Sequence, residues 1–95
     1  MEFASRGAED TYDGLDSERA RKTLPRSLHG KAQNKLSIAA FAESLEDLRV
    51  PPNNHLEKLR GDRAGQYSIR INERYRICFR WVNGEAVDVE IVDYH

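Results

Sequence analysis

Residues 67–81 read YSIRINERYRICFRW, and this stretch decides the fold. Apolar and polar side chains alternate on both sides of Asn72-Glu73, and a period of two is typical of strands that bury one face. The sequence therefore predicts an antiparallel hairpin with one face in the protein core. That face carries Tyr67, Ile69, Ile71, Tyr75, Ile77, Phe79 and Trp81.

The opposite face of this hairpin is basic. Neighbouring side chains of a strand point to opposite sides, so this face carries Ser68, Arg70, Arg74, Arg76, Cys78 and Arg80. Any sheet with one exposed face needs polar residues there. However, Arg60 and Arg63 lie just upstream, and such a density of arginine is typical of nucleic-acid-binding surfaces. We therefore expect the basic face to be exposed to water and to bind phosphates.

Helices are predicted for the first half of the chain. One short helix is expected in residues 8–13, and a second, capped by Asp16 or Ser17, ends at Thr23. The main helix follows Pro25, and its apolar side chains have the spacing of a stripe that packs on the hairpin. The stripe consists of Leu28, Ala32, Leu36 and Ala39, whereas His29, Lys31, Gln33, Asn34 and Lys35 are expected to face mostly water. Phe41 lies off the stripe and suits either packing or the docking of a partner.

Strand signals lie on both sides of these helices. Met1 and Phe3 would share one face of a short first strand, and Asn83-Gly84 is a strong turn signal after the hairpin. A third strand is then predicted, with Val87, Val89 and Ile91 facing the core. The chain is therefore expected to form a single α+β domain over residues 1–95, with N-terminal helices on one face of a small antiparallel sheet.

Length and composition narrow the possible classes of protein. Ninety-five residues suffice for one domain. One cysteine, Cys78, excludes an internal disulfide and a multi-cysteine metal site, so nothing in the sequence indicates an oxidising compartment. No apolar run approaches the roughly 20 residues of a membrane span, and the acidic start does not resemble a signal peptide. These features predict a cytoplasmic protein that does not associate with membranes.

Charge is strongly segregated along the chain, although the formal net charge is only -1. Residues 1–18 carry a net charge of -5, residues 19–48 carry +3, residues 49–80 carry +5, and residues 81–95 carry -4. Segregation of this kind creates a local positive field without a basic isoelectric point. The field is expected around the hairpin, where the arginines are concentrated.

The same region holds the residue types that cleave RNA without a metal ion. Such a reaction needs a base for the 2′-OH proton, cations for the charge of the transition state, and an acid for the leaving 5′-oxygen. Guanidinium groups suit the cationic role, because their N–H forks match phosphate oxygens, but they remain protonated and cannot act as the base. The candidate cations are Arg60, Arg63, Arg70 and Arg76, and the candidate bases are Glu57, His55, Asp93 and His95.

Several motifs together resemble the HigB toxins of the RelE/ParE superfamily. They are LExLRGDRxGQYSIRIN at residues 56–72, YRIxF at residues 75–79, and the closing DYH at residues 93–95. The resemblance extends upstream to ARKTLP at residues 20–25 and LEDLRVPP at residues 45–52, so it covers nearly the whole chain. It implies a RelE/ParE-like single domain.

The resemblance also implies a function. A chain of this kind would be the toxin of a type II toxin-antitoxin pair, which enters the ribosomal A site and cuts translated mRNA without a metal or cofactor. Its partners would be the ribosome with its rRNA, the mRNA, and a HigA-like helix-turn-helix antitoxin. Operator DNA would be contacted only through that antitoxin.

The resemblance assigns roles to particular residues. The phosphate-binding cations of the family correspond here to Arg60, Arg63 and Arg76, with Arg70 nearby, and its functional C-terminal residues correspond to Asp93, Tyr94 and His95. Some HigB toxins have histidine and lysine where this chain has Glu57 and Arg60. A glutamate at that position resembles the YoeB branch, in which a glutamate, an arginine and a late histidine act together. This implies a catalytic trio of Glu57, Arg76 and His95, with His55 as a second candidate base.

The chain end poses a problem of facing. Strict alternation after Ile91 places Asp93 and His95 on the core side of the sheet and Tyr94 on the basic side, where its ring can stack on a base. A bulge after Ile91 would bring Asp93 and His95 to the basic side.

Two other functions remain open, namely a ParE-like inhibitor of DNA gyrase and a degenerate homologue that only binds its antitoxin. The proton-transfer groups Glu57 and His95 favour the nuclease.

Overall fold

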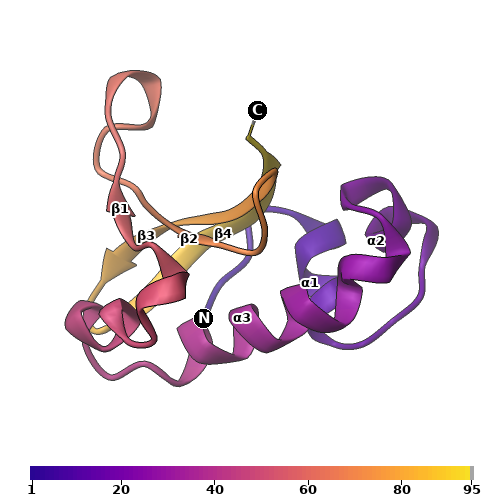
Figure 1. The fold of residues 1–95 in the computed structure, drawn as a ribbon, viewed down its shortest axis with the longest axis horizontal. Helices are drawn as coiled ribbons and strands as arrows, with labels where there is room; N and C mark the ends of the chain where they lie inside the picture. The colour runs from indigo at the N-terminus through magenta and orange to yellow at the C-terminus, as the bar shows by residue number, and fades with distance from the viewer. Residues whose placement is uncertain (95) are drawn as a thin grey trace.

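The computed structural model describes residues 1–94, and it has the predicted α+β architecture (Figure 1). The three α-helices of this part are α1 (Arg6–Tyr12), α2 (Glu18–Thr23) and α3 (His29–Phe41). The short 3-10 helices are η1 (Arg26–Leu28), η2 (Leu45–Arg49), η3 (Pro52–Asn54) and η4 (Gly61–Arg63), and the strands are β1 (Glu57–Lys58), β2 (Tyr67–Arg70), β3 (Tyr75–Val82) and β4 (Glu85–Asp93). The strands form one antiparallel sheet in the order β1-β2-β3-β4. No helix within residues 1–94 has the length and apolar character needed to cross a membrane.

Strands β2 and β3 form the predicted hairpin. Tyr67 lies opposite Phe79 and Ile69 opposite Ile77, so the apolar residues share one face, as expected. Asn72 closes the connection, because its Oδ1 accepts hydrogen bonds from the backbone N–H groups of Arg74 and Tyr75 at 2.9 and 2.8 Å. Such a side-chain contact two or three residues ahead is typical of asparagine in turns.

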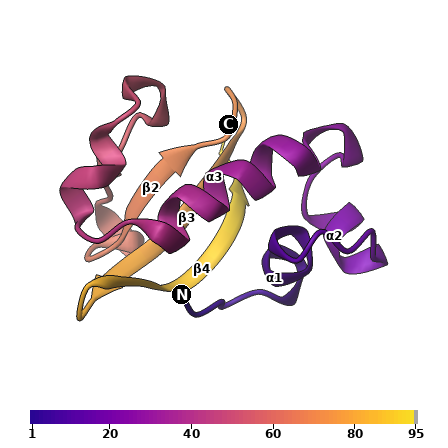
Figure 2. The same cartoon turned by 90° about the horizontal axis from the view of Figure 1, so that it is seen from below.

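Helix α3 packs across the apolar face of the sheet, as Figure 2 shows. Ala32, Leu36 and Ala39 of the predicted stripe are fully buried, and Leu28 packs at the edge of the core. One expectation for this helix is wrong, because Lys35 is buried rather than exposed to water. Of the two roles left open for Phe41, packing in the core is excluded, because this residue is 80% exposed.

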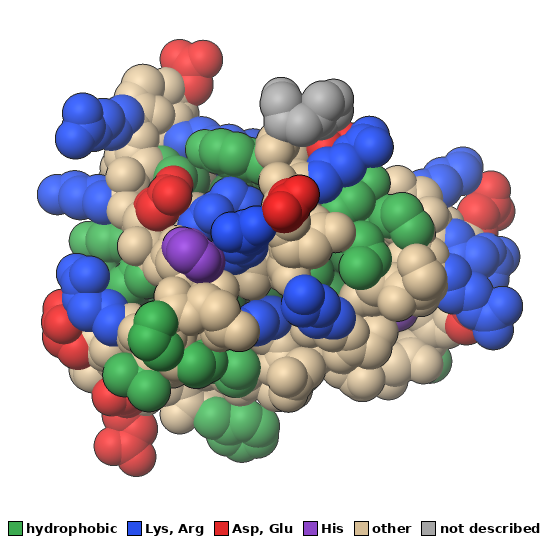
Figure 3. Space-filling view, viewed as in Figure 1, with side chains coloured by type: hydrophobic (Ala, Val, Ile, Leu, Met, Phe, Trp, Pro, Cys, Tyr) green, Lys and Arg blue, Asp and Glu red, His purple; other side chains and the backbone are tan. Residues whose placement is uncertain are grey.

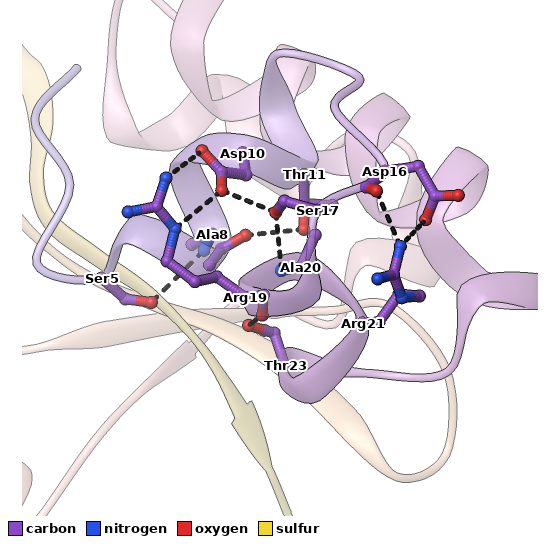
Figure 4. Close-up of polar contacts among 11 residues, drawn as sticks. Ser5, Ala8, Asp10, Thr11, Asp16, Ser17, Arg19, Ala20, Arg21 and Thr23 are labelled. Carbon is purple, nitrogen blue, oxygen red and sulfur yellow. Dashed lines mark hydrogen bonds and ion pairs between the residues drawn. The ribbon is translucent and has the colours of Figure 1, made fainter.

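Helices α1 and α2 are joined by a polar network around a buried carboxylate (Figure 4). The Ser17 hydroxyl caps α2 by accepting from the Ala20 N–H, and it donates to Asp10 Oδ2 at 2.6 Å. That hydrogen bond, together with Arg19 Nε at 3.0 Å, lowers the pKa of Asp10 below its usual value. Gly7 lies inside α1, where a Cβ atom would stand 2.0 Å from Thr23 Oγ1. The close approach of α2 therefore explains this glycine, which the sequence placed just outside the helix.

The third predicted strand, β4, contains a bulge. Cys78 lies opposite Glu90, but Arg80 lies opposite Val87, so β4 has one residue more than β3 over this interval. Asp88 has a φ of 52°, which is the left-handed conformation that bulges commonly use. The bulge therefore lies before Ile91 and not after it.

This bulge changes which residues of β4 face the core. Ala86 and Val89 are buried, whereas Val87, which was expected in the core, is only partly buried. Beyond the bulge the register is regular, and it places Asp93 opposite Tyr75. Residues 2–4 run beside β4 with backbone hydrogen bonds to Ala86 and Val89, so the expected first strand is a single parallel bridge.

The contact between α3 and the sheet is expected to dominate stability. Leu36→Ala should lower the free energy of unfolding by about 2 to 5 kcal/mol, because it leaves a cavity between α3 and the hairpin. Urea denaturation of the purified chain measures this change. Phe41→Ala, in the same helix but on its exposed side, is the control and should stay within about 0.5 kcal/mol of wild type. Equal effects of the two substitutions would contradict the packing described.

Candidate active site

The second face of the sheet is less exposed than the sequence predicts. Ser68 and Cys78 are fully buried, and Arg76 is 9% exposed. Burial raises the pKa of the Cys78 thiol above its usual value. The segment after β1 rises on the side of the sheet away from α3 (Figure 1), and a Cβ atom on Gly65 would lie 2.9 Å from Arg80 Nη1. The alternating pattern of the strands could not predict that the 61–66 segment approaches β3 and covers part of this face.

Arg76 is held by hydrogen bonds to two other parts of the chain. Its Nε donates to Ser68 Oγ at 2.7 Å, and its Nη2 donates to the backbone carbonyl of His55. Its Nη1 lies 3.9 Å from Oε1 of Glu57. The Arg76 side chain is 11% exposed, whereas that of Glu57 is 56% exposed. The guanidinium group of Arg76 is therefore held in place by Ser68 and His55, and the solvent-accessible carboxylate of Glu57 lies beside it.

The sheet brings these residues together from separate strands. Glu57 lies opposite Ser68, which lies opposite Cys78, and Arg76 lies opposite Arg70 in the next row. Directly opposed residues share a face of the sheet and are close in space. The two-residue strand β1 thus places Glu57 near Arg76.

The loop before β1 positions the His55 carbonyl. The buried Asn54 donates from Nδ2 to the carbonyls of Leu48 and Val50 at 3.2 and 3.4 Å, which closes the turn around η3. Immediately after it, His55 has a left-handed backbone with a φ of 46°. The His55 carbonyl consequently contacts Arg76, while the His55 side chain remains exposed. Sequence reasoning missed this backbone contact, because only the ring of His55 was considered.

Arg63 lies over the opposed residues Glu57, Ser68, Cys78 and Glu90 of the four strands. Its guanidinium donates to Glu90 at 3.2 Å and to Gln66 Oε1 at 3.0 Å. Burial works against the charge of Arg63, but the hydrogen bond from Arg63 to Glu90, followed by the charges of Cys78, Glu90 and Tyr94, raises its pKa. Arg63 is therefore held on the same face as Arg76. Arg60, by contrast, is exposed at the start of η4.

The C-terminal candidates are attached to a different arginine. Asp93 accepts from Nε and Nη2 of Arg74 at 2.9 and 2.8 Å, and this contact raises the pKa of Arg74. Asp93 lies opposite Tyr75, on the core side that strict alternation predicts. The backbone N–H of Tyr94 donates to the Arg74 carbonyl, and the Tyr94 side chain is 40% exposed. His95 lies outside the described residues.

The arrangement supplies a cation and a proton acceptor at one solvent-accessible place. Arg76 offers a fixed positive charge, and the carboxylate of Glu57 can accept a proton from a group bound beside it. Within residues 1–94, no three side chains of His, Cys, Asp or Glu are grouped as a metal site would need. Sequence reasoning did not assign Ser68 to the site. The one signal that could have found it is the alternation of the strands, which places Ser68 on the same face as Arg76.

Comparisons with known proteins agree with this fold. A family model described as the RelE-like toxin of the type II toxin-antitoxin system HigB matches residues 1–95. Toxin HigB-1 of Vibrio cholerae serotype O1 is 35% identical over 88 residues, which are 93% of this chain and 90% of that protein. Endoribonuclease HigB of Proteus vulgaris is 42% identical over 40 residues, 42% of this chain and 44% of that protein. The YoeB-YefM complex from Staphylococcus aureus contains a similar fold, with a TM-score of 0.55 and 19% identity over 99% of this chain and 93% of that one.

The burial of Arg76 predicts that it also contributes to stability. Arg76→Ala removes the donors to Ser68 and His55 and should lower the free energy of unfolding by about 1 to 3 kcal/mol. Arg60→Ala removes the same charge from an exposed position and should change it by less than about 0.5 kcal/mol. Chemical denaturation of both variants measures the difference. A fully stable Arg76→Ala protein would show that these hydrogen bonds do not anchor the site.

Proposed function

The chain belongs to the HigB-like family of RelE-like toxins from type II toxin-antitoxin systems, and from this premise we propose that it is a ribosome-dependent endoribonuclease. It enters the ribosomal A site and cuts mRNA during translation, and so inhibits protein synthesis in the cytoplasm. The observation that carries the proposal is the exposed Glu57 carboxylate 3.9 Å from the fixed guanidinium of Arg76. The name of the Proteus vulgaris relative, endoribonuclease HigB, supports the type of activity.

The proposed reaction is an internal transfer of the phosphoryl group. Glu57 takes the proton of the ribose 2′-OH, and the 2′-oxygen attacks the adjacent phosphorus. Arg76 stabilises the negative charge that develops on the phosphate oxygens. The bond to the 5′-oxygen breaks, and His95 donates a proton to that oxygen. The products are a 2′,3′-cyclic phosphate and a 5′-hydroxyl, and no water is consumed in this step.

The remaining candidate residues serve substrate binding in this proposal. Arg63 and Arg70 lie on the face of Arg76 and bind neighbouring phosphates, and exposed Arg60 contacts RNA further out. Tyr94 stacks on a base. Asp93 orients the chain end through its contact with Arg74.

The proposed partner in the resting cell is a HigA-like helix-turn-helix antitoxin. Membership of a type II toxin-antitoxin family supports an antitoxin partner, and operator DNA would be bound through that protein. Exposed Phe41 is a candidate contact for it, since this ring is not used in the core.

Mapping of mRNA 5′ ends after induction tests the proposed function. Wild-type chain should produce new ends inside translated reading frames, and Glu57→Gln should reduce their yield about 10²- to 10⁴-fold, because the amide cannot accept the proton. Lys58→Ala, at the adjacent exposed position, is the control and should cut normally. Growth arrest without new mRNA ends would instead indicate a gyrase inhibitor of the ParE type.

Binding to ribosomes is expected to depend strongly on salt. If Arg60, Arg63, Arg70 and Arg76 each neutralise one phosphate, the affinity should fall about 50-fold between about 50 and about 200 mM monovalent salt, because bound counterions are released. Sedimentation of the Glu57→Gln chain with programmed ribosomes measures this without cleavage. An affinity that does not change with salt would contradict the electrostatic basis of binding.

A further inference from the structure

A second basic site lies beside the candidate active site. A pocket of about 220 Å³ lies between α3, η3 and the turn that joins β2 to β3. The side chains that give it its chemistry are Lys31, Lys35, Asn53, His55, Arg70 and Glu73. Figure 3 shows Lys and Arg side chains gathered near a histidine in the middle of one face of the molecule.

Lys35 is the least expected member of this pocket. It is 6% exposed, and its Nζ donates to Asn54 Oδ1 at 2.6 Å and to Asn53 Oδ1 at 3.4 Å. These two amide oxygens satisfy hydrogen bonds but carry no net charge. Burial, and to a smaller extent the charge of Lys31, lower the pKa of Lys35. An anion in the pocket would offset both of these unfavourable effects, because its negative charge attracts both ammonium groups.

The pocket contains more positive than negative charge. Lys31, Lys35 and Arg70 line it together with a single acidic residue, Glu73. Glu73 is 94% exposed and lies 3.9 Å from Arg70, and such an exposed pair contributes little. The lining therefore has the charge and the donors that a phosphate group requires.

Two residues connect this pocket to the active site. His55 lines the pocket, and its carbonyl accepts a hydrogen bond from Arg76. Arg70 also lines the pocket, and it lies opposite Arg76 in the β2-β3 register. A polymer that carries one phosphate per nucleotide can therefore occupy both places with a single strand.

We propose that this pocket binds a second phosphate of the RNA strand that the Arg76 site cuts. The proposal rests on the proposed function, and it assigns substrate-binding roles to Lys31, Lys35 and Asn53, which sequence reasoning left outside the site. Binding of two phosphates fixes the direction of the strand across the sheet. It also makes a single nucleotide a poorer ligand than a longer strand.

Phosphate binding by the pocket is tested first without RNA. Inorganic phosphate, titrated into the whole chain at constant ionic strength, should shift the backbone amide resonances of Asn53, His55 and Asn72 in a saturable way. Lys31→Ala should weaken this response about tenfold, because it removes a positive charge from the pocket. The substitution should not disturb α3, because alanine is a strong helix former. Lys22→Ala removes another exposed lysine, from α2, and is the control. Absence of the shifts, or equal shifts in wild type and Lys31→Ala, would overturn the proposal.

The role in RNA binding is tested with short single-stranded RNA and with programmed ribosomes. Lys31→Ala should weaken binding about tenfold and reduce the slope of log affinity against log salt by about 0.7, while Lys22→Ala leaves both unchanged. If wild type and Lys31→Ala cut translated mRNA equally well, the pocket inference fails and the proposed function stands. If wild type does not cut, the proposed function fails, and the phosphate titration still decides whether the pocket binds an anion. Loss of antitoxin binding with RNA binding intact would assign the pocket to an acidic protein segment and overturn the proposal.

Discussion

A buried guanidinium connects the sheet to the loop that precedes it. Arg76 of β3 donates one hydrogen bond to Ser68 of β2 and another to the backbone of His55. A charged group is costly to bury unless its hydrogen bonds are made, so this residue has few alternative positions. The candidate active site depends on this constraint, because Glu57 gains a fixed cationic neighbour only when Arg76 is held in place.

The helical half of the chain takes part in the same constraint. Asn54 accepts from Lys35 of α3 and donates to the carbonyls that close the turn around η3. Because His55 follows Asn54 directly, the position of its carbonyl depends on this contact with the helix. The second basic site and the candidate active site are therefore linked through Asn54 and His55.

The sequence determines some features locally and leaves others to the tertiary fold. The hairpin and the stripe with Leu36 follow from periods of two and of 3.6, which are properties of a single element, and both predictions are confirmed. The predictions that Arg76 and Lys35 are exposed to water failed, because alternation and helical spacing say which side a residue faces but not what covers that side. Both residues are covered by segments distant in sequence. The bulge at Asp88 also escaped prediction, since the Val-Asp-Val-Glu-Ile pattern of β4 is regular.

The most direct test of the account is a double-mutant cycle between Ser68 and Arg76, measured as single-turnover cleavage of mRNA on programmed ribosomes. Ser68 is fully buried, so in the proposed mechanism it can influence cleavage only through its hydrogen bond to Arg76 Nε. Ser68→Ala and Arg76→Lys should each slow cleavage by about 10²-fold, because each displaces the positive charge from its position beside the phosphate. The double variant should be no slower than Arg76→Lys alone, because lysine has no Nε–H for Ser68 to hold. Effects that multiply in the double variant would show that Ser68 does not act through Arg76 and would contradict this account of the site.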